Sequence, residues 1–127
     1  MNPLVLDIIQ KNLPIKKSKK DKNGEVFTPL TLVNEMLDKL PVDVWNNPDL
    51  KWLDPANGVG NFPVVVYYRL MEGLRDCMLE EEERSKHIIE NMLYMVELDQ
   101  HNCDVCKKIF SIINPNAVPN IDCRSFL

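Results

Sequence analysis

The fold class follows from residues 54–62, which read Asp54-Pro55-Ala56-Asn57-Gly58-Val59-Gly60-Asn61-Phe62. A short apolar run at 52–53 precedes them, which is typical of a buried parallel strand, and Pro63 stands where the next helix begins. The loop must then lie at the carboxyl edge of a parallel sheet, where such sheets bind ligands. Gly58 and Gly60 permit a tight turn and a close approach to a ligand, and the N-terminus of the following helix favours an anion.

Outward from this loop, apolar periodicity predicts alternating helices and strands. Before the loop we expect a helix at 5–12 and another from Thr28, its capping residue, and Pro29, its first residue, to about residue 40. After the loop, the pattern predicts helices at 62–77, 87–92 and 100–113 and strands at 93–96 and 121–123. Such alternation implies parallel pairing through right-handed crossovers. The predicted fold class is α/β, a parallel sheet with helices on both faces that stops after about three strands.

Glu97 ends the second predicted strand, where an acidic side chain can accept both hydroxyls of a ribose, and Leu98 beside it can cover one face of an adenine ring. A nicotinamide-binding enzyme would use the same geometry, but Pro63 stands where the third glycine of its fingerprint is expected. The 37 residues from Gly60 to Glu97 also exceed the roughly 20 of that fingerprint, although the acidic insertion at 80–83 can account for the difference. A tight turn that binds no ligand is a further alternative for the loop.

Charge is unevenly distributed along the chain, whose formal net charge is -4. Residues 1–24 carry six lysines and two aspartates, a net +4, which leaves -8 on the remainder. The basic segment 16–22, with Lys16, Lys17, Lys19, Lys20 and Lys22, can approach a phosphate backbone or be a solvated lead-in. We expect residues 1–24 to form a basic N-terminal helix and linker ahead of a single domain at 25–127.

Cysteine usage and hydropathy bear on location. Cys77, Cys103, Cys106 and Cys123 occur in a chain without an export signal or a run of about 18 apolar residues. We therefore expect reduced thiols, no membrane contact, and a cytoplasmic or nuclear location, or the cytoplasm of a virus-infected host. Cys103 and Cys106, preceded by His101, are half of a possible zinc site, but no second pair stands at ligand spacing. Helical periodicity favours a packed helix face there, so no metal is expected.

The loop at 54–62 resembles the first cofactor motif of the amino-methylating DNA methyltransferases, usually Asp-Pro-x-x-Gly-x-Gly-x-Phe. Residues 24–29, Gly24-Glu25-Val26-Phe27-Thr28-Pro29, resemble the upstream motif of this family, and residues 94–99, Tyr94-Met95-Val96-Glu97-Leu98-Asp99, resemble its second motif. The resemblance runs from about residue 24 to the end of the chain. It implies the N-terminal, cofactor-binding part of an S-adenosylmethionine-dependent DNA adenine-N6 methyltransferase of the restriction-modification type, with a partial Rossmann-like methyltransferase fold.

The resemblance also assigns roles to residues. It implies that the methionine part of S-adenosyl-L-methionine is held by Thr28, Pro29, Asp54, Gly58 and Gly60, and that Phe62 closes the motif. It further implies that Glu97 accepts hydrogen bonds from the ribose hydroxyls and that Leu98 packs against the adenine. Residues 120–127 resemble the third motif, except that Ser125 stands where the family has an aspartate that accepts from the adenine amino group. A serine hydroxyl can also accept that bond, though without charge.

The family's catalytic segment, Asn/Asp-Pro-Pro-Tyr/Phe, has no counterpart, because the 127 residues contain no two consecutive prolines. In the family this segment lies on the fourth strand and holds the flipped target base. We therefore predict no catalytic residue in this chain and expect it to bind cofactor at most. In this fold the fourth strand flanks the first, so we expect a free edge near Trp52 and Leu53. A missing C-terminal half or a second copy of the chain would then cover it.

Two hypotheses follow. In the first, the chain is the S-adenosylmethionine-binding portion of a site-specific DNA methyltransferase that methylates the N6 amine of adenine, and it reaches DNA through the full-length enzyme and the basic segment 16–22. In the second, the chain is a non-catalytic methyltransferase-like binding or interaction module. Ser125 and the missing catalytic segment favour the second, whereas the intact glycine loop and Glu97 favour the first.

Overall fold

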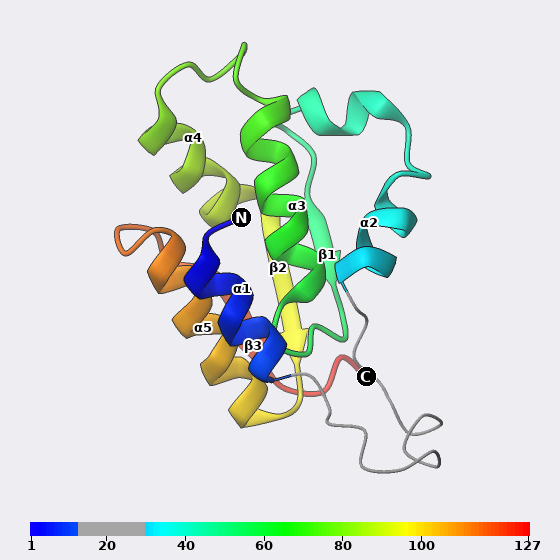
Figure 1. The fold of residues 1–127 in the computed structure, drawn as a ribbon, viewed down its shortest axis with the longest axis vertical. Coiled ribbons are helices and arrows are strands. Elements are labelled where there is room, and N and C mark those ends of the chain that lie inside the picture. The colour runs from blue at the N-terminus through cyan, green and yellow to red at the C-terminus, as the bar shows by residue number, and fades with distance from the viewer. Residues whose placement is uncertain (13–29) are drawn as a thin grey trace.

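A computed structural model of the protein describes residues 1–12 and 30–127, and a three-stranded parallel sheet lies at its centre (Figure 1). The strands are β1 (Trp52–Asp54), β2 (Leu93–Glu97) and β3 (Asn120–Cys123), in the spatial order β1-β2-β3. Across the sheet, Leu53 pairs with Tyr94, and Tyr94 with Asn120. The three strands lie where the sequence predicts them.

The described helical segments are α1 (Pro3–Lys11), α2 (Leu30–Leu37), the 3₁₀ turn η2 (Val42–Asn46), α3 (Asn61–Gly73), α4 (Glu81–His87), the π-helical turn η3 (Ile88–Met92) and α5 (Gln100–Ile113). The helices expected in the described ranges are present in the predicted order, and the structure adds η2 and α4. The helix expected at 87–92 begins earlier, because the side chain of Glu80 caps α4 by accepting a hydrogen bond from the N–H of Glu83. Within the described ranges, no helix has the length and apolar character needed to cross a membrane.

Both crossover helices lie on the same face of the sheet. The chain passes from β1 to β2 through α3 and from β2 to β3 through α5, and both steps run in one direction across the sheet. Right-handed crossovers in one direction place their helices on one side, and the rings of Tyr67 in α3 and Phe110 in α5 meet edge-on at 6.5 Å. The α/β class and the parallel sheet flanked by helices are confirmed.

The opposite face of the sheet carries Leu53, Tyr94 and Asn120, which share a register position. It borders a hollow of about 480 Å³. Residues of strands and loops line this hollow, and none of its described lining residues belongs to a helix. In the part of the chain that is described, helices therefore cover one face of the sheet. The helices expected on its other face are not among these residues.

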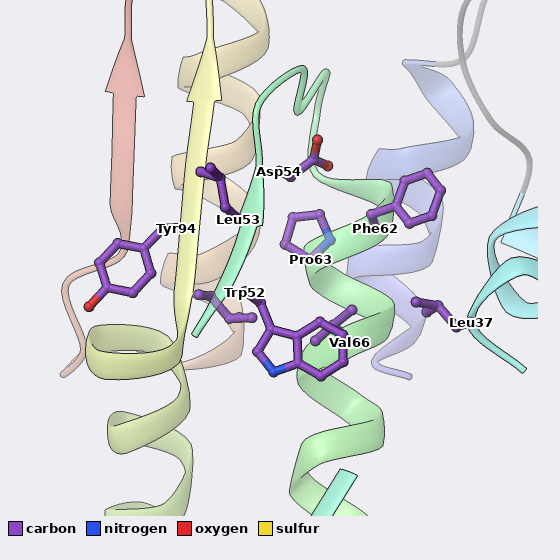
Figure 2. A pocket seen from close by; sticks show the side chains of 9 residues that line it. Leu37, Trp52, Leu53, Asp54, Phe62, Pro63, Val66 and Tyr94 are labelled. Atoms are coloured by element: carbon purple, nitrogen blue, oxygen red, sulfur yellow. The ribbon is translucent and has the colours of Figure 1, made fainter. Parts of the chain in front are cut away.

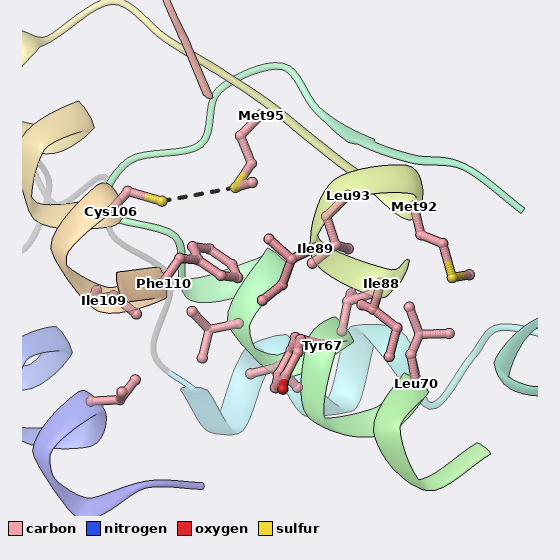
Figure 3. Packing of buried hydrophobic residues seen from close by; sticks show 14 of the residues in the cluster. Tyr67, Leu70, Ile88, Ile89, Met92, Leu93, Met95, Cys106, Ile109 and Phe110 are labelled. Atoms are coloured by element: carbon pink, nitrogen blue, oxygen red, sulfur yellow. Dashed lines mark hydrogen bonds between the residues drawn. The ribbon is translucent and has the colours of Figure 1, made fainter. Parts of the chain in front are cut away.

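The hydrophobic core lies between the sheet and the helices (Figure 3). Leu93 and Met95 point into it from β2 and Phe110 from α5, and each is at most 2% exposed. Val5 and Ile9 of α1 are fully buried in the same cluster. Because these side chains belong to the core cluster, α1 packs as part of the same unit as the sheet. Burying one such side chain stabilises the fold by about 1.5–3 kcal/mol.

β1 is the edge strand that the sequence predicts. Among the described residues it pairs with β2 alone, and Leu53 is 56% exposed. On the helix side, Trp52 stacks on Trp45 of η2 with ring centroids 4.9 Å apart. The indole Nε1 of Trp52 is buried and has no hydrogen-bond partner in the described ranges. No strand of the described ranges covers the outer backbone edge of β1, which leaves that edge available to a further strand.

Candidate functional site

The glycine loop turns sharply between β1 and α3. Gly58 has φ 60° and Gly60 has φ 106°, values that L-residues with a side chain rarely adopt. Gly60 is the N-terminal cap of α3, and no side chain caps that end. A Cβ at Gly60 would lie 3.0 Å from the Sγ of Cys106 in α5, so the loop and α5 are in close contact. The strand-loop-helix arrangement predicted from the two glycines is present.

Asn57 fixes this loop against β2 and α5. Its backbone N–H donates to the carbonyl of Val96 at 3.0 Å, and its Nδ2 donates to the Sγ of Cys106 at 3.3 Å. The residue is 5% exposed. The contact between Asn57 and Cys106 was not predicted from the sequence. Asn57 stands at a variable position of the motif, and its partner is supplied by a helix about fifty residues further along the chain, so no local signal could have identified the pair.

Glu97 brings the two predicted cofactor segments together. Its Oε1 accepts a hydrogen bond from the N–H of Gly58 at 2.8 Å. Its Oε2 accepts from the N–H of Asp99 at 2.9 Å and from the Nδ2 of Asn102 at 3.3 Å. The side chain is half-buried at the carboxyl end of β2. The end of β2 and the glycine loop are thus one hydrogen-bonded unit, to which Asn102, missed by sequence analysis, also belongs.

Asp54 carries an acceptor that lacks a partner. Its Oδ1 accepts from the N–H of Ala56 at 3.2 Å, whereas its Oδ2 is buried with no partner in the described ranges. Burial raises the pKa of this carboxyl above its usual value of 3.8, the Ala56 hydrogen bond opposes the rise, and the charge of Glu97 adds to it. A cation or a hydrogen-bond donor beside Oδ2 would stabilise the ionised form.

Two other predicted site residues lie near the end of the sheet. Leu98 follows Glu97 directly and is 71% exposed. Ser125 is also exposed and lies two residues beyond β3, where the N–H of Arg124 donates to the carbonyl of Glu97 at 2.9 Å. The ends of β2 and β3 therefore meet, and Leu98 and Ser125 lie on the two segments that leave this junction.

Phe62 lies in the first turn of α3 and shares a pocket with Asp54. It lines a pocket of about 220 Å³ on the β1 side of the sheet (Figure 2). Leu37 of α2, Trp52 of β1 and Val66 of α3 share that lining, and Asp54 is the one ionisable acid among the lining residues. The pocket is otherwise apolar and opens beside the free edge of β1, so Asp54 stands between it and the glycine loop.

Some predicted residues lie outside the described ranges. These are Thr28, Pro29, the rest of the upstream motif at 24–29, and the basic segment 16–22.

The segment from His101 to Cys106 is helical. Cys103 and Cys106 lie on the buried face of α5. Within the described ranges, no group of three or more His, Cys, Asp or Glu residues is arranged to hold a metal ion. The interpretation of this segment as a packed helix face is therefore confirmed by its burial.

A glycine loop after the first strand and an acidic side chain at the end of the second are the arrangement of nucleotide-binding α/β proteins. No protein-family model matches the chain. An adenine-specific methylase of Mycoplasma pneumoniae, itself uncharacterised, is 46% identical over 79 residues, which cover 60% of this chain and 19% of the relative.

A solved structure is similar in fold: a chain described as a modification subunit of a type I restriction enzyme from Vibrio vulnificus YJ016. The TM-score is 0.51 at 23% identity, over 77% of this chain and 18% of that one. The chain thus spans about a fifth of the length of either protein. The resemblance to an adenine-specific methylase is confirmed over 79 residues, and the fold is similar to that of part of a restriction-enzyme modification subunit.

Proposed function

We propose that the chain binds S-adenosylmethionine at the carboxyl edge of its sheet, as the cofactor-binding portion of a DNA adenine-N6 methyltransferase. The observation that carries this proposal is the 2.8 Å hydrogen bond between the N–H of Gly58 and the Oε1 of Glu97. It joins the loop that would contact the methionine part to the carboxylate that would contact the ribose. The two halves of one ligand would then meet at a single hydrogen-bonded unit.

The methionine end of the cofactor fits the loop. It carries an ammonium group, and the buried Oδ2 of Asp54 is an acceptor without a partner among the described residues. An ammonium at this position would offset the burial that raises the pKa of Asp54. The uncapped N-terminus of α3 at Gly60 suits the carboxylate of the same amino acid. Thr28, Pro29 and Phe62 are proposed to complete this end.

The adenosine end fits the ends of β2 and β3. The carboxylate of Glu97 faces the loop and accepts three hydrogen bonds from described residues. A carboxylate can accept about four. A ribose hydroxyl can donate to the remaining position. Leu98, 71% exposed, offers an apolar surface to an adenine ring, and Ser125 is proposed to accept from the adenine amino group.

When bound, S-adenosylmethionine supplies a methyl group attached to a positively charged sulfur. The full-length enzyme is proposed to transfer this methyl to adenine in DNA, by relationship to the adenine-specific methylase. The 127 residues contain no Pro-Pro-Tyr/Phe segment. We therefore infer that this chain binds and orients the cofactor and that other residues hold the base.

Two partners are proposed for this portion. The five lysines of segment 16–22 suit a phosphate backbone, where each contact would add salt-dependent affinity. The open edge of β1 suits the remaining part of a methyltransferase or, without it, a second copy of the chain.

A non-catalytic interaction module is the alternative function. The specific observation in its favour is the uncovered sheet face at Leu53 and Tyr94 beside an open strand edge, which suits a protein partner as well as a further part of an enzyme. Such a module need not bind any cofactor.

A thermal-denaturation series separates these functions. The melting temperature of the chain is measured with S-adenosylmethionine, S-adenosylhomocysteine or NAD at equal concentrations. A ligand present at 100 times its Kd stabilises the fold by about 2.7 kcal/mol, so we expect the first two to raise the melting temperature and NAD to leave it unchanged. A rise with NAD alone would identify a nicotinamide-binding protein, and no rise with any of the three would favour the interaction module.

A further inference from the structure

Three donors of the described residues hold the carboxylate of Glu97, and one of the three is a side chain. The N–H groups of Gly58 and Asp99 belong to the backbone, whereas the third donor is the Nδ2 of Asn102, 3.3 Å from Oε2. Asn102 is the third residue of α5 and is half-buried. Its own N–H donates to the Oδ1 of Asp99 at 3.0 Å, which fixes the first helical turn.

The arrangement of these donors determines which acceptor position stays open. Among the described residues, Oε2 accepts from Asp99 and from Asn102, and Oε1 accepts from Gly58 alone. Because a carboxylate oxygen accepts about two hydrogen bonds, the open position is on Oε1, beside the glycine loop. Without Asn102, Oε2 would keep a single donor and the carboxylate could rotate about its last bond.

From this geometry we infer that Asn102 is a positioning residue, which holds the Glu97 carboxylate under Gly58 with one acceptor directed toward the ribose of the cofactor. The ligand part of this inference rests on the proposed function. Asn102 acts through its hydrogen bond to Glu97.

The first experiment needs no ligand. Amide hydrogen exchange of the full chain is followed by NMR in the wild type and in Asn102→Leu and Asn102→Asp. We expect exchange at the Gly58 amide to rise about five- to tenfold in both variants, as expected for the loss of roughly 1 kcal/mol of hydrogen bonding. The Asn57 amide, which donates to the carbonyl of Val96, should exchange at its wild-type rate. Equal exchange at Gly58 in all three proteins would overturn the inference.

Asn102→Asp separates positioning from folding. Aspartate has the shape of asparagine, and an acidic residue in the first turn of a helix favours that helix, yet it cannot donate to Glu97. Gln100→Glu is the matched control, because it adds the same charge to the same turn while its side chain contacts Asp104 and Cys123. The control should retain the wild-type exchange rate at Gly58.

The second experiment measures the ligand consequence. Kd is determined for S-adenosylmethionine and for an analogue without both ribose hydroxyls. We expect the wild type to prefer the natural cofactor about tenfold or more, as for hydrogen bonds to a charged group. In Asn102→Asp the preference should fall at least threefold relative to Gln100→Glu. If Asn102→Asp keeps the wild-type preference, or binds the natural cofactor more tightly because a ribose hydroxyl takes the place of Asn102, the inference about Asn102 is overturned. The proposed function would then stand. A wild type that binds neither ligand would instead overturn the proposed function and the ligand part of this inference.

Discussion

Gly58 and Glu97 are 39 residues apart in the sequence and are joined by a 2.8 Å hydrogen bond from the N–H of the glycine to a carboxylate oxygen of the glutamate. The bond crosses from the glycine loop to the end of β2. Glu97 therefore contributes to the shape of the loop, and we propose that it also offers an acceptor to the ligand. Substitutions in this part of the molecule should separate the two.

Gly60 should not tolerate a side chain. At φ 106° an alanine is strained, and its Cβ would lie 3.0 Å from the Sγ of Cys106. We expect Gly60→Ala to lower the free energy of unfolding by about 1–3 kcal/mol, measured by urea denaturation. In a Cys106→Ala background the same substitution should be less harmful, because the contact with sulfur is removed and only the backbone strain remains. Equal losses in the two backgrounds would show that the loop and α5 are not in contact at this point.

Asp54 should make the fold less stable at neutral pH. Its native pKa is raised above 3.8 by burial, so the native state binds its proton at pH values where the unfolded chain has released it. The free energy of unfolding therefore falls as pH rises from about 3.8 through the native pKa, and the loss persists above it. We expect Asp54→Asn to raise the melting temperature by about 2–5 °C at pH 7, which corresponds to less than about 1 kcal/mol.

The same substitution provides its own control. The advantage of Asp54→Asn should shrink as the pH is lowered, because both states of the wild type then carry the proton. Binding of S-adenosylmethionine should weaken in the variant, since an amide attracts an ammonium less than a carboxylate does. A variant that is less stable than the wild type at pH 7 would show that burial of the ionised Asp54 carboxylate does not destabilise the fold.

The four cysteines should differ in reactivity. Cys77 and Cys123 are exposed, whereas Cys103 and Cys106 are fully buried, and burial raises the pKa of each of these two thiols to about 12. At pH 8 the buried pair is therefore protonated as well as inaccessible. We expect iodoacetamide to modify the exposed pair in the folded chain and all four thiols in urea, as measured by mass spectrometry. An adduct on Cys106 under native conditions would show that the packing of α5 against the loop is wrong.

The sequence predicts most of the architecture, because its signals are local. The apolar residues of β2 and the periodic residues of α5 each specify an element without reference to the rest of the chain. The helix that begins at Glu81 was missed because the acidic run 80–83 was interpreted as surface charge. That run is the first turn of α4, and the same helix buries Ser85, whose Oγ lies 2.7 Å from the hydroxyl of Tyr67.

The site was predicted less completely, and the reason is tertiary. Gly58, Gly60 and Glu97 are recognisable because backbone conformation and charge restrict the residue types at those positions. The contacts of Asn57 with Cys106 and of Asn102 with Glu97 depend on how α5 packs, which no local pattern encodes. Thr28 and Pro29 lie outside the described residues, so their assigned role stays a prediction.

Calorimetric titration with S-adenosylmethionine shows whether the glycine loop and Glu97 form a cofactor site. The wild type is compared with Gly58→Val, Glu97→Ala and the exposed control Glu83→Ala, each first shown to be folded by circular dichroism. We expect saturable binding at one site in the wild type and in Glu83→Ala, and at least tenfold weaker binding in Gly58→Val and Glu97→Ala. Gly58→Val disturbs the backbone geometry of the loop, and Glu97→Ala removes the hydrogen bond on which the site depends. Binding of equal strength in all four proteins would place the cofactor elsewhere and contradict the account.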